Sequence, residues 1–89
     1  MSQGRYEIRI TPSAQKEMDR LPGQQRGRVE AAIVALADNP RPVGSLKMQG
    51  VENTYRIRVG NYRIVYRVYD HELVVLVVAV GDRKDIYRR

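Results

Sequence analysis

Three segments of the chain alternate apolar and polar side chains with a period of two, which is the pattern of a half-buried β-strand. They cover residues 5–10, 54–59 and 62–69. The dipeptide Gly60-Asn61 separates the last two, and this composition is typical of a tight hairpin turn whose backbone adopts positive φ. We therefore expect one strand near the start of the chain and a β-hairpin in its second half.

A helical spacing replaces the alternation between the first strand and the hairpin. Thr11 followed by Pro12 is a typical N-cap with proline at the first helical position, and the first helix is predicted to end near Leu21. A second helix is predicted over residues 24–36, where apolar residues recur at i, i+3, i+4 and i+7. The apolar positions of the two helices are Ala14, Met18, Leu21, Val29, Ala32, Ile33 and Leu36. A Pro-Gly pair between the helices makes them short antiparallel neighbours.

The last strand is expected over residues 72–80, which are apolar on both faces and follow a turn at Asp70-His71. A further short extended piece is expected at residues 46–48. The order β-α-α-β-β-β predicts one α+β domain spanning residues 1–89. In this domain a helical hairpin packs on a twisted, antiparallel-rich sheet.

The hairpin register assigns the strand residues to two faces of the sheet. One face is predicted to pack under Val29, Ile33 and Leu36 of the second helix. Its members are Tyr55, Ile57, Ile64, Tyr66, Leu73, Val75 and Val77. The other face carries four arginines and three apolar residues, namely Arg56, Arg58, Arg63, Arg67, Val74, Leu76 and Val78. Arg58 and Arg63 lie directly opposite each other, which is unfavourable for two like charges. This face is either exposed to solvent or a surface that binds an anionic, partly apolar partner.

Composition narrows the class of protein. The 89 residues are 43% hydrophobic and 29% charged, which is a globular composition with enough apolar residues for one modest core. The longest apolar run, residues 73–80, is far shorter than the roughly 20 residues of a membrane-spanning helix, and the start shows no export signal. We therefore expect a cytoplasmic protein without membrane contact. The chain has no cysteine, which excludes disulfide frameworks, thiol catalysis and cysteine-based zinc or iron–sulfur sites.

Charge points to the kind of partner. Sixteen basic residues against ten acidic ones give a net charge of +6, which favours a polyanion. Most of the basic residues are arginine, the side chain suited to two-pronged contacts with phosphate. His71, the only histidine, lies in a predicted turn without a serine–aspartate set around it. The aspartates are scattered at turns and ends, so neither a metal site nor a cofactor is expected.

Two motifs make the chain resemble a known family. They are residues 55–66 (YRIRVGNYRIVY) and residues 80–88 (VGDRKDIYR), with Leu46-Lys47 before Gly50 as a weaker addition. Together with the order of elements, they make the whole chain similar to the RelE group of the RelE/ParE superfamily, the toxins of bacterial and archaeal toxin–antitoxin pairs. The resemblance implies a RelE-like fold. It also implies a ribosome-dependent toxin that cuts the mRNA codon in the ribosomal A site and is neutralised by a cognate antitoxin.

The same resemblance implies which residues surround the scissile phosphate. They are Arg56 and Arg58 before the hairpin turn, Arg63 after it, Arg83 after the last strand, and Tyr87 in the tail, whose ring would stack on a base. Taken without the family, Tyr87 is equally well explained as a ring that packs on the edge of the core.

Two positions depart from the family pattern. Arg56 stands where some members carry a lysine proposed as the general base, and Asp82 stands where many carry histidine. Arginine is a poor proton acceptor near neutral pH, so we expect the rate to come from alignment of the 2′-hydroxyl on the ribosome and from arginine charge, with Arg83 stabilising the leaving oxygen. The expected enzyme is a metal-independent endoribonuclease that acts by attack of the 2′-oxygen and leaves a cyclic phosphate.

Two other functions stay open from the residues alone. One is a ParE-like toxin that inhibits DNA gyrase without nuclease activity, and the other is a non-catalytic RNA-binding protein. The cluster of Arg56, Arg58, Arg63 and Arg83 favours the endoribonuclease, because the gyrase inhibitors share the fold but do not usually present it. The partners expected for the leading function are a cognate antitoxin, the ribosome with its A-site mRNA, and ribosomal RNA.

Overall fold

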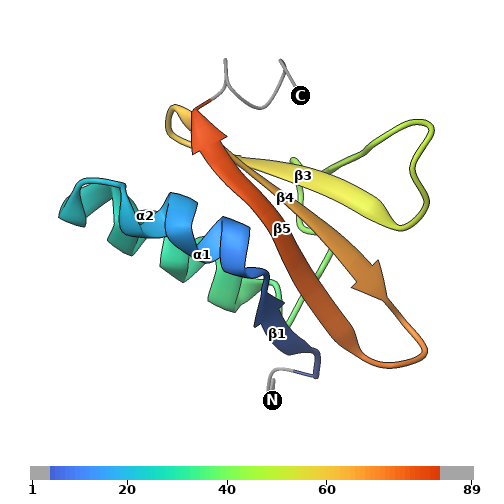
Figure 1. The fold of residues 1–89 in the computed structure, drawn as a ribbon. Helices are drawn as coiled ribbons and strands as arrows, with labels where there is room; N and C mark the ends of the chain where they lie inside the picture. Colours follow the sequence, from blue (N-terminus) through green and yellow to red (C-terminus); the bar gives the residue numbers. More distant parts are fainter. Residues whose placement is uncertain (1–4, 83–89) are drawn as a thin grey trace.

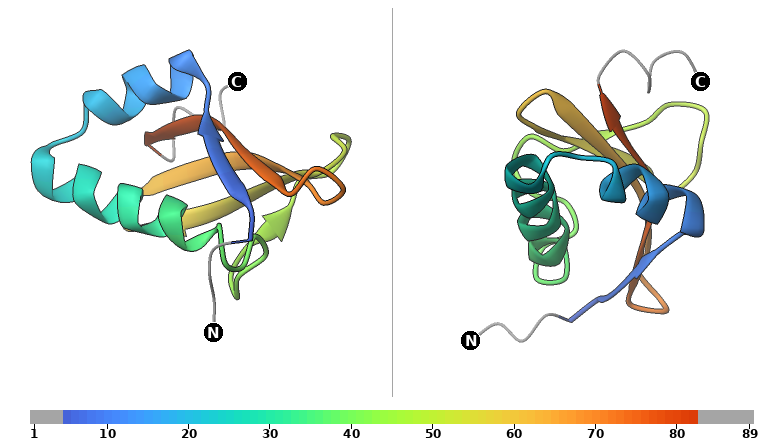
Figure 2. Two further views of the ribbon diagram at one scale, coloured as in Figure 1. Left: turned by 90° about the horizontal axis from the view of Figure 1, so that it is seen from below. Right: turned by 60° about the vertical axis from the view of Figure 1, so that its left-hand side comes forward.

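The computed structural model of the chain describes residues 5–82 (Figure 1). Its elements, in chain order, are β1 (Glu7–Ile10), α1 (Pro12–Asp19), α2 (Gly23–Ala35), β2 (Leu46–Lys47), β3 (Thr54–Val59), β4 (Tyr62–Tyr69) and β5 (Val74–Asp82). The strands form a five-stranded sheet in the order β1-β5-β4-β3-β2, in which β1 is parallel to β5 and the other neighbours are antiparallel. Both helices lie on the same face of this sheet (Figure 2). The predicted α+β fold is confirmed.

Local capping chemistry sets the start of α1. The Thr11 hydroxyl accepts a hydrogen bond from the backbone N–H of Ala14 at 3.1 Å, and Pro12 occupies the first helical position, as predicted. The helix ends at Asp19, two residues before the predicted end at Leu21. Beyond it, two N–H groups bond to carbonyls three residues back rather than four, which tightens the chain out of α-helical geometry.

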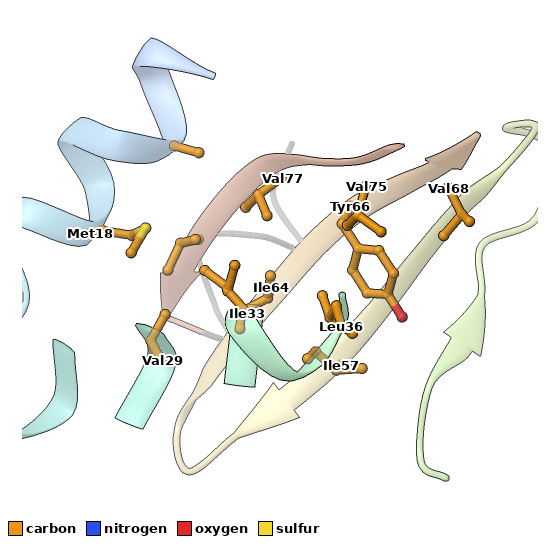
Figure 3. Packing of buried hydrophobic residues seen from close by; sticks show 12 residues of the cluster. Met18, Val29, Ile33, Leu36, Ile57, Ile64, Tyr66, Val68, Val75 and Val77 are labelled. Atoms are coloured by element: carbon orange, nitrogen blue, oxygen red, sulfur yellow. The ribbon is translucent and has the colours of Figure 1, made fainter. Parts of the chain in front are cut away.

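The core lies between the two helices and the sheet (Figure 3). Its buried members are Ala14, Met18, Val29, Ile33, Leu36, Ile57, Ile64, Tyr66, Val68, Val75, Val77 and Val80. Tyr66 is completely buried, and its hydroxyl donates a 2.7 Å hydrogen bond to the carbonyl of Pro40. This bond satisfies the buried phenol and ties the loop after α2 to the sheet.

The prediction that Leu73 belongs to the core is wrong. Its side chain is 43% exposed, and its backbone φ of 56° lies in the left-handed region. The connection between β4 and β5 takes the four residues from Asp70 to Leu73 and closes with a 3.4 Å hydrogen bond between the backbones of these two residues. The last strand therefore begins at Val74 rather than at Glu72, and the other six predicted strand residues of the core face are buried or half-buried.

The hairpin of β3 and β4 has the predicted limits and register. Gly60 has a φ of 60°, whereas Asn61 is not among the residues with positive φ, so glycine takes the first central position, as in a type II′ turn. This turn matches the twist of the flanking strands and sets Arg58 directly opposite Arg63.

The pairing of β4 with β5 shifts by one residue, which corrects the predicted position of Val78. Val65 pairs with Ala79, whereas the next residue of β4 pairs with Val77, so Val78 is an extra residue in β5. The two predicted apolar residues before this bulge keep their places on the arginine-bearing face. Beyond the bulge the alternation is shifted, and Ala79 rather than Val78 occupies the paired position on that face.

Candidate nucleic-acid interface

Four arginines of β3 and β4 lie on the sheet face that the helices leave uncovered. We call this set the arginine face: Arg56, Arg58, Arg63 and Arg67. Arg58 pairs with Arg63, Arg56 pairs with Val65, and Arg67 pairs with Thr54. The predicted register is therefore confirmed, and it brings three of the predicted site residues onto one surface.

The arginine face differs from an ordinary solvated strand because two of its side chains are covered. Arg63 is only 8% exposed and Arg56 is half-buried, and the Nε atom of each is fully covered. A side chain covered as far as Nε has fewer rotamers left, so its charge is held more closely in place relative to the sheet. Arg58 and Arg67 are exposed. Two held arginines thus lie beside two exposed ones that can change conformation. This arrangement is suited to binding a polyanion.

The end of β5 lies at the same end of the sheet as the β3–β4 turn (Figure 1). Gly81 pairs with Arg63, and Asp82, the last described residue, pairs with Tyr62. Arg83 and Tyr87, the two remaining predicted site residues, lie outside the described residues. The described part of the predicted site therefore lies near the end of β5, after which Arg83 and Tyr87 follow in the sequence.

The opposite end of the same face carries apolar residues as well. Val74 and Leu76 line a hollow of about 230 Å³ together with Tyr69, Arg9 and Glu72. The parallel strand β1 supplies one wall, because its Arg9 pairs with Leu76. Near β1 the uncovered face therefore adds an apolar hollow to the arginines of β3 and β4.

Another arginine, which the sequence analysis did not single out, forms a polar network away from the arginine face. The Nη2 atom of Arg41 lies 2.7 Å from a carboxylate oxygen of Asp70, and its Nε donates to the Tyr55 hydroxyl at 3.0 Å. The Tyr6 hydroxyl donates to the other Asp70 oxygen at 2.7 Å. The hydrogen bond from Arg41, followed by that from Tyr6, lowers the pKa of the Asp70 carboxyl. Arg41 thus has a carboxylate partner and joins segments of the fold.

The remaining chemistry of residues 5–82 is sparse. His71 is exposed in the turn between β4 and β5. Within these residues there is no group of three His, Cys, Asp or Glu side chains that could hold a metal ion. None of the helices described here is long and apolar enough to cross a membrane.

Comparison with known proteins decides the family. A family model described as the ParE toxin of the type II toxin-antitoxin system matches residues 8–87. Toxin RelG of Mycobacterium tuberculosis is 34% identical, and the match covers 94% of this chain and 98% of that protein. The chain belongs to the RelE group of the RelE/ParE toxin superfamily.

Two further matches of this RelE-group toxin extend over nearly the whole domain. The mRNA interferase toxin RelE of Escherichia coli K12 is 30% identical over 92% of this chain and 90% of its own length. The structure of an archaeal RelE–RelB complex from Pyrococcus horikoshii matches with a TM-score of 0.80 and 25% identity, over 89% of this chain and 96% of that one. The RelE-like fold predicted from the motifs is confirmed.

Proposed function

We propose that this RelE-group toxin is a ribosome-dependent endoribonuclease that cleaves mRNA in the ribosomal A site and so inhibits translation. The observation that carries the proposal is the arginine face, where Arg63 is buried directly opposite Arg58 and close to Arg56. Opposed like charges by themselves cost a few tenths to about 1 kcal/mol in a sheet, and a phosphate bound between them would offset this cost. The relative named mRNA interferase toxin RelE supports the same substrate class.

The covered and exposed arginines suit different tasks. Arg56 and Arg63 would hold the scissile phosphate in a fixed place, because their side chains are already ordered by the sheet. Arg58 is exposed, and its guanidinium would bind the same phosphate from beside the turn. Guanidinium groups form paired hydrogen bonds to phosphate oxygens, which fixes orientation as well as neutralising charge.

The reaction follows from these roles. The 2′-oxygen of the A-site nucleotide attacks the adjacent phosphorus, and the bond from phosphorus to the 5′-oxygen breaks. The products are a 2′,3′-cyclic phosphate and a 5′-hydroxyl, so the proton lost by the 2′-hydroxyl is balanced by the one gained by the leaving oxygen. Arginine favours this step by stabilising negative charge on the phosphate, while the ribosome aligns the nucleotide.

Arg83 and Tyr87 complete the proposed site. Arg83 would stabilise the leaving 5′-oxygen, and the Tyr87 ring would stack on a base of the bound codon. Such a site lacks a strong general base, which is why we expect mRNA in solution to be a poor substrate compared with mRNA held on the ribosome.

The cognate partner is proposed to be a RelB-type antitoxin. Structures of relatives include RelE–RelB complexes, such as the archaeal one. The hollow lined by Val74 and Leu76 can receive apolar side chains, while the net charge of +6 favours an acidic segment. An antitoxin that covers the arginine face would exclude RNA from it.

A second function, inhibition of DNA gyrase, is worth testing because the matching family model carries the ParE description. Such a toxin would act by protein contact and would need no cluster of arginines for a scissile phosphate. The arginine face therefore favours the endoribonuclease.

The test is to incubate the toxin with translating ribosomes on a defined mRNA and to map the new 5′ ends. Cuts confined to A-site codons, and absent from the same mRNA without ribosomes, support the proposal. Arg9→Ala is a matched control, since it removes an exposed arginine that pairs with Glu7 at 2.9 Å, away from the hairpin turn. Gyrase-dependent DNA breaks, or ribosome binding without any cut, would overturn it.

A further inference from the structure

The side chain of Glu17 links the helix α1 to the end of β5. One of its carboxylate oxygens accepts a hydrogen bond from the backbone N–H of Val80 at 2.7 Å. Glu17 is half-buried, because α1 packs against β5 and buries Ala14 and Met18. A hydrogen bond from a backbone N–H to an ionised carboxylate is about twice as strong as one between neutral groups. The bond is therefore a strong local link between the helix and the strand.

The bonded N–H lies beyond the point where β1 supports β5. β1 pairs with β5 only as far as Val77, whose carbonyl also accepts a 3.0 Å hydrogen bond from the Thr11 N–H. The extra residue Val78 follows directly, so pairing with β1 does not set the path of the strand after it. Glu17 supplies a fixed point on the far side of this bulge.

Two residues of the proposed cleavage site depend on this end of the strand. Gly81, which directly follows the bonded Val80, pairs with Arg63 in β4. Arg83 comes two residues after Gly81 in the sequence. A shift of the strand end would therefore change the position of Arg63 relative to the start of the segment that carries Arg83.

We propose that Glu17 is a positioning residue for the proposed cleavage. Its hydrogen bond to Val80 fixes the end of β5, beside Arg63 and directly before Arg83 in the sequence, in the place that the reaction requires. Glu17 comes from the face of the sheet that the helices cover, so it acts through the strand and does not contact the phosphate (Figure 2). The inference rests on the proposed function, because it takes Arg83 as the residue that stabilises the leaving oxygen.

The test compares Glu17→Ala with Glu17→Gln in single-turnover cleavage on ribosomes saturated with toxin. Both variants remove the negative charge, but glutamine keeps a side-chain oxygen that can accept the Val80 N–H. We expect Glu17→Ala to cut at least about tenfold more slowly, because small displacements of reacting groups have large effects on rate. Glu17→Gln should keep most of the wild-type rate. Both variants should bind ribosomes within about twofold of the wild type, since neither loses a positive charge.

Asp19→Ala is a matched control on the same helix. The Asp19 carboxylate is exposed and accepts a 3.0 Å hydrogen bond from the Gln15 side chain, so its removal should leave the cleavage rate unchanged. Amide hydrogen exchange at Val80 measures the proposed bond directly, and it should be faster in Glu17→Ala than in Glu17→Gln or the wild type. Thermal melts check that every variant is folded at the temperature of the assay.

Three results would overturn the inference while the proposed function stands. They are a wild-type cleavage rate in Glu17→Ala, equal losses of rate in Glu17→Ala and Glu17→Gln, and weaker ribosome binding with an unchanged rate at saturation. The second would assign the effect to charge, and the third would place Glu17 in contact with the ribosome. A wild-type toxin that makes no cut in the same assay would overturn the proposed function, and this inference with it.

Discussion

At the scale of single residues, Arg63 combines an internal position in the sheet with a side chain on the arginine face. Its backbone pairs with Arg58 and Gly81, so it is an internal residue of the sheet, while its side chain is 8% exposed and lies on the arginine face. A lysine or arginine in the middle of a strand usually extends its charged end into water. Arg63 instead has a covered Nε, so its side chain lies against the sheet. Under the proposed function, this position would hold the guanidinium in place for a phosphate.

The first prediction concerns the phosphate contacts of Arg56, Arg58 and Arg63. Alanine at any of these positions should weaken binding to programmed ribosomes, because each substitution removes a positive charge that is proposed to contact a phosphate. Each substitution should also lower the slope of log affinity against log salt by about 0.7 to 0.9. Binding titrations at several salt concentrations measure this slope. An unchanged slope in all three variants would mean that the arginine face contacts no phosphate.

The second prediction separates the two faces of the sheet. Ile64 is fully buried in the core, so Ile64→Ala should lower the free energy of unfolding by about 2 to 5 kcal/mol. Arg56→Ala should lower it much less, because Arg56 is half-buried on the uncovered face. Urea unfolding of both variants compares the two values. A larger destabilisation by Arg56→Ala than by Ile64→Ala would mean that the core lies on the other face of the sheet.

At the scale of the elements, the short strand β1 leaves the second half of β5 without a paired strand on the side opposite β4. β1 pairs with β5 only from Val74 to Val77, so the later backbone groups of β5 form an edge. The carboxylate of Glu17 on α1 accepts the Val80 N–H at 2.7 Å. A helix side chain thus takes the place of a strand and anchors the part of β5 that precedes the proposed site.

The third prediction concerns the connection between β4 and β5. Hydrogen bonds from Arg41 and Tyr6 lower the pKa of Asp70 below its ordinary value of 3.8, so the ionised carboxylate stabilises the folded state. This contribution is complete above about pH 5 and is lost as the pH falls through the lowered pKa. Asp70→Asn should therefore destabilise the protein at pH 7, with a smaller difference from wild type at pH 3.

Unfolding free energies at the two pH values measure this difference. Glu52→Gln is a suitable control, because Glu52 is exposed and forms no ion pair within the described part of the chain. An Asp70→Asn effect of the same size at both pH values would contradict the pairing with Arg41.

The elements that the sequence predicted well are those with local signals. Thr11-Pro12 specifies the start of α1, and Gly60-Asn61 specifies the hairpin and hence the register of the arginines. The bulge at Val78 has no such signal, because an apolar run is equally compatible with either register. The pairing of β1 with β5 depends on contacts between distant segments, which no window of sequence contains.

At the scale of the whole molecule, the hydrophobic core and the arginine face lie on opposite sides of the sheet. The helices cover one face of the sheet and form the core, while arginines gather on the other face and around the hairpin tip. The net charge of +6 therefore favours binding of an RNA or of an acidic antitoxin segment on the uncovered side. The active toxin would poison the cell that makes it.

The fourth prediction follows from that toxicity. Expression of the wild-type chain alone in a bacterium should arrest growth and give little protein, and co-expression with its antitoxin should restore both. Arg83→Ala should express well without the antitoxin, because the proposed stabiliser of the leaving oxygen is gone. Growth curves and yields of the two chains provide the comparison. Equal growth and yield for both, without an antitoxin, would contradict the toxin's proposed activity.

The central claim is that the arginine site cleaves mRNA held in the ribosomal A site, and single-turnover cleavage on ribosomes saturated with toxin tests it most directly. The wild-type toxin should cut within the A-site codon and leave a 2′,3′-cyclic phosphate. Arg83→Ala should bind nearly as well and cut at least about 10²-fold more slowly, as expected for a group that acts mainly in the transition state. The account is contradicted if the wild-type toxin makes no cut there, or if Arg83→Ala cuts at the wild-type rate.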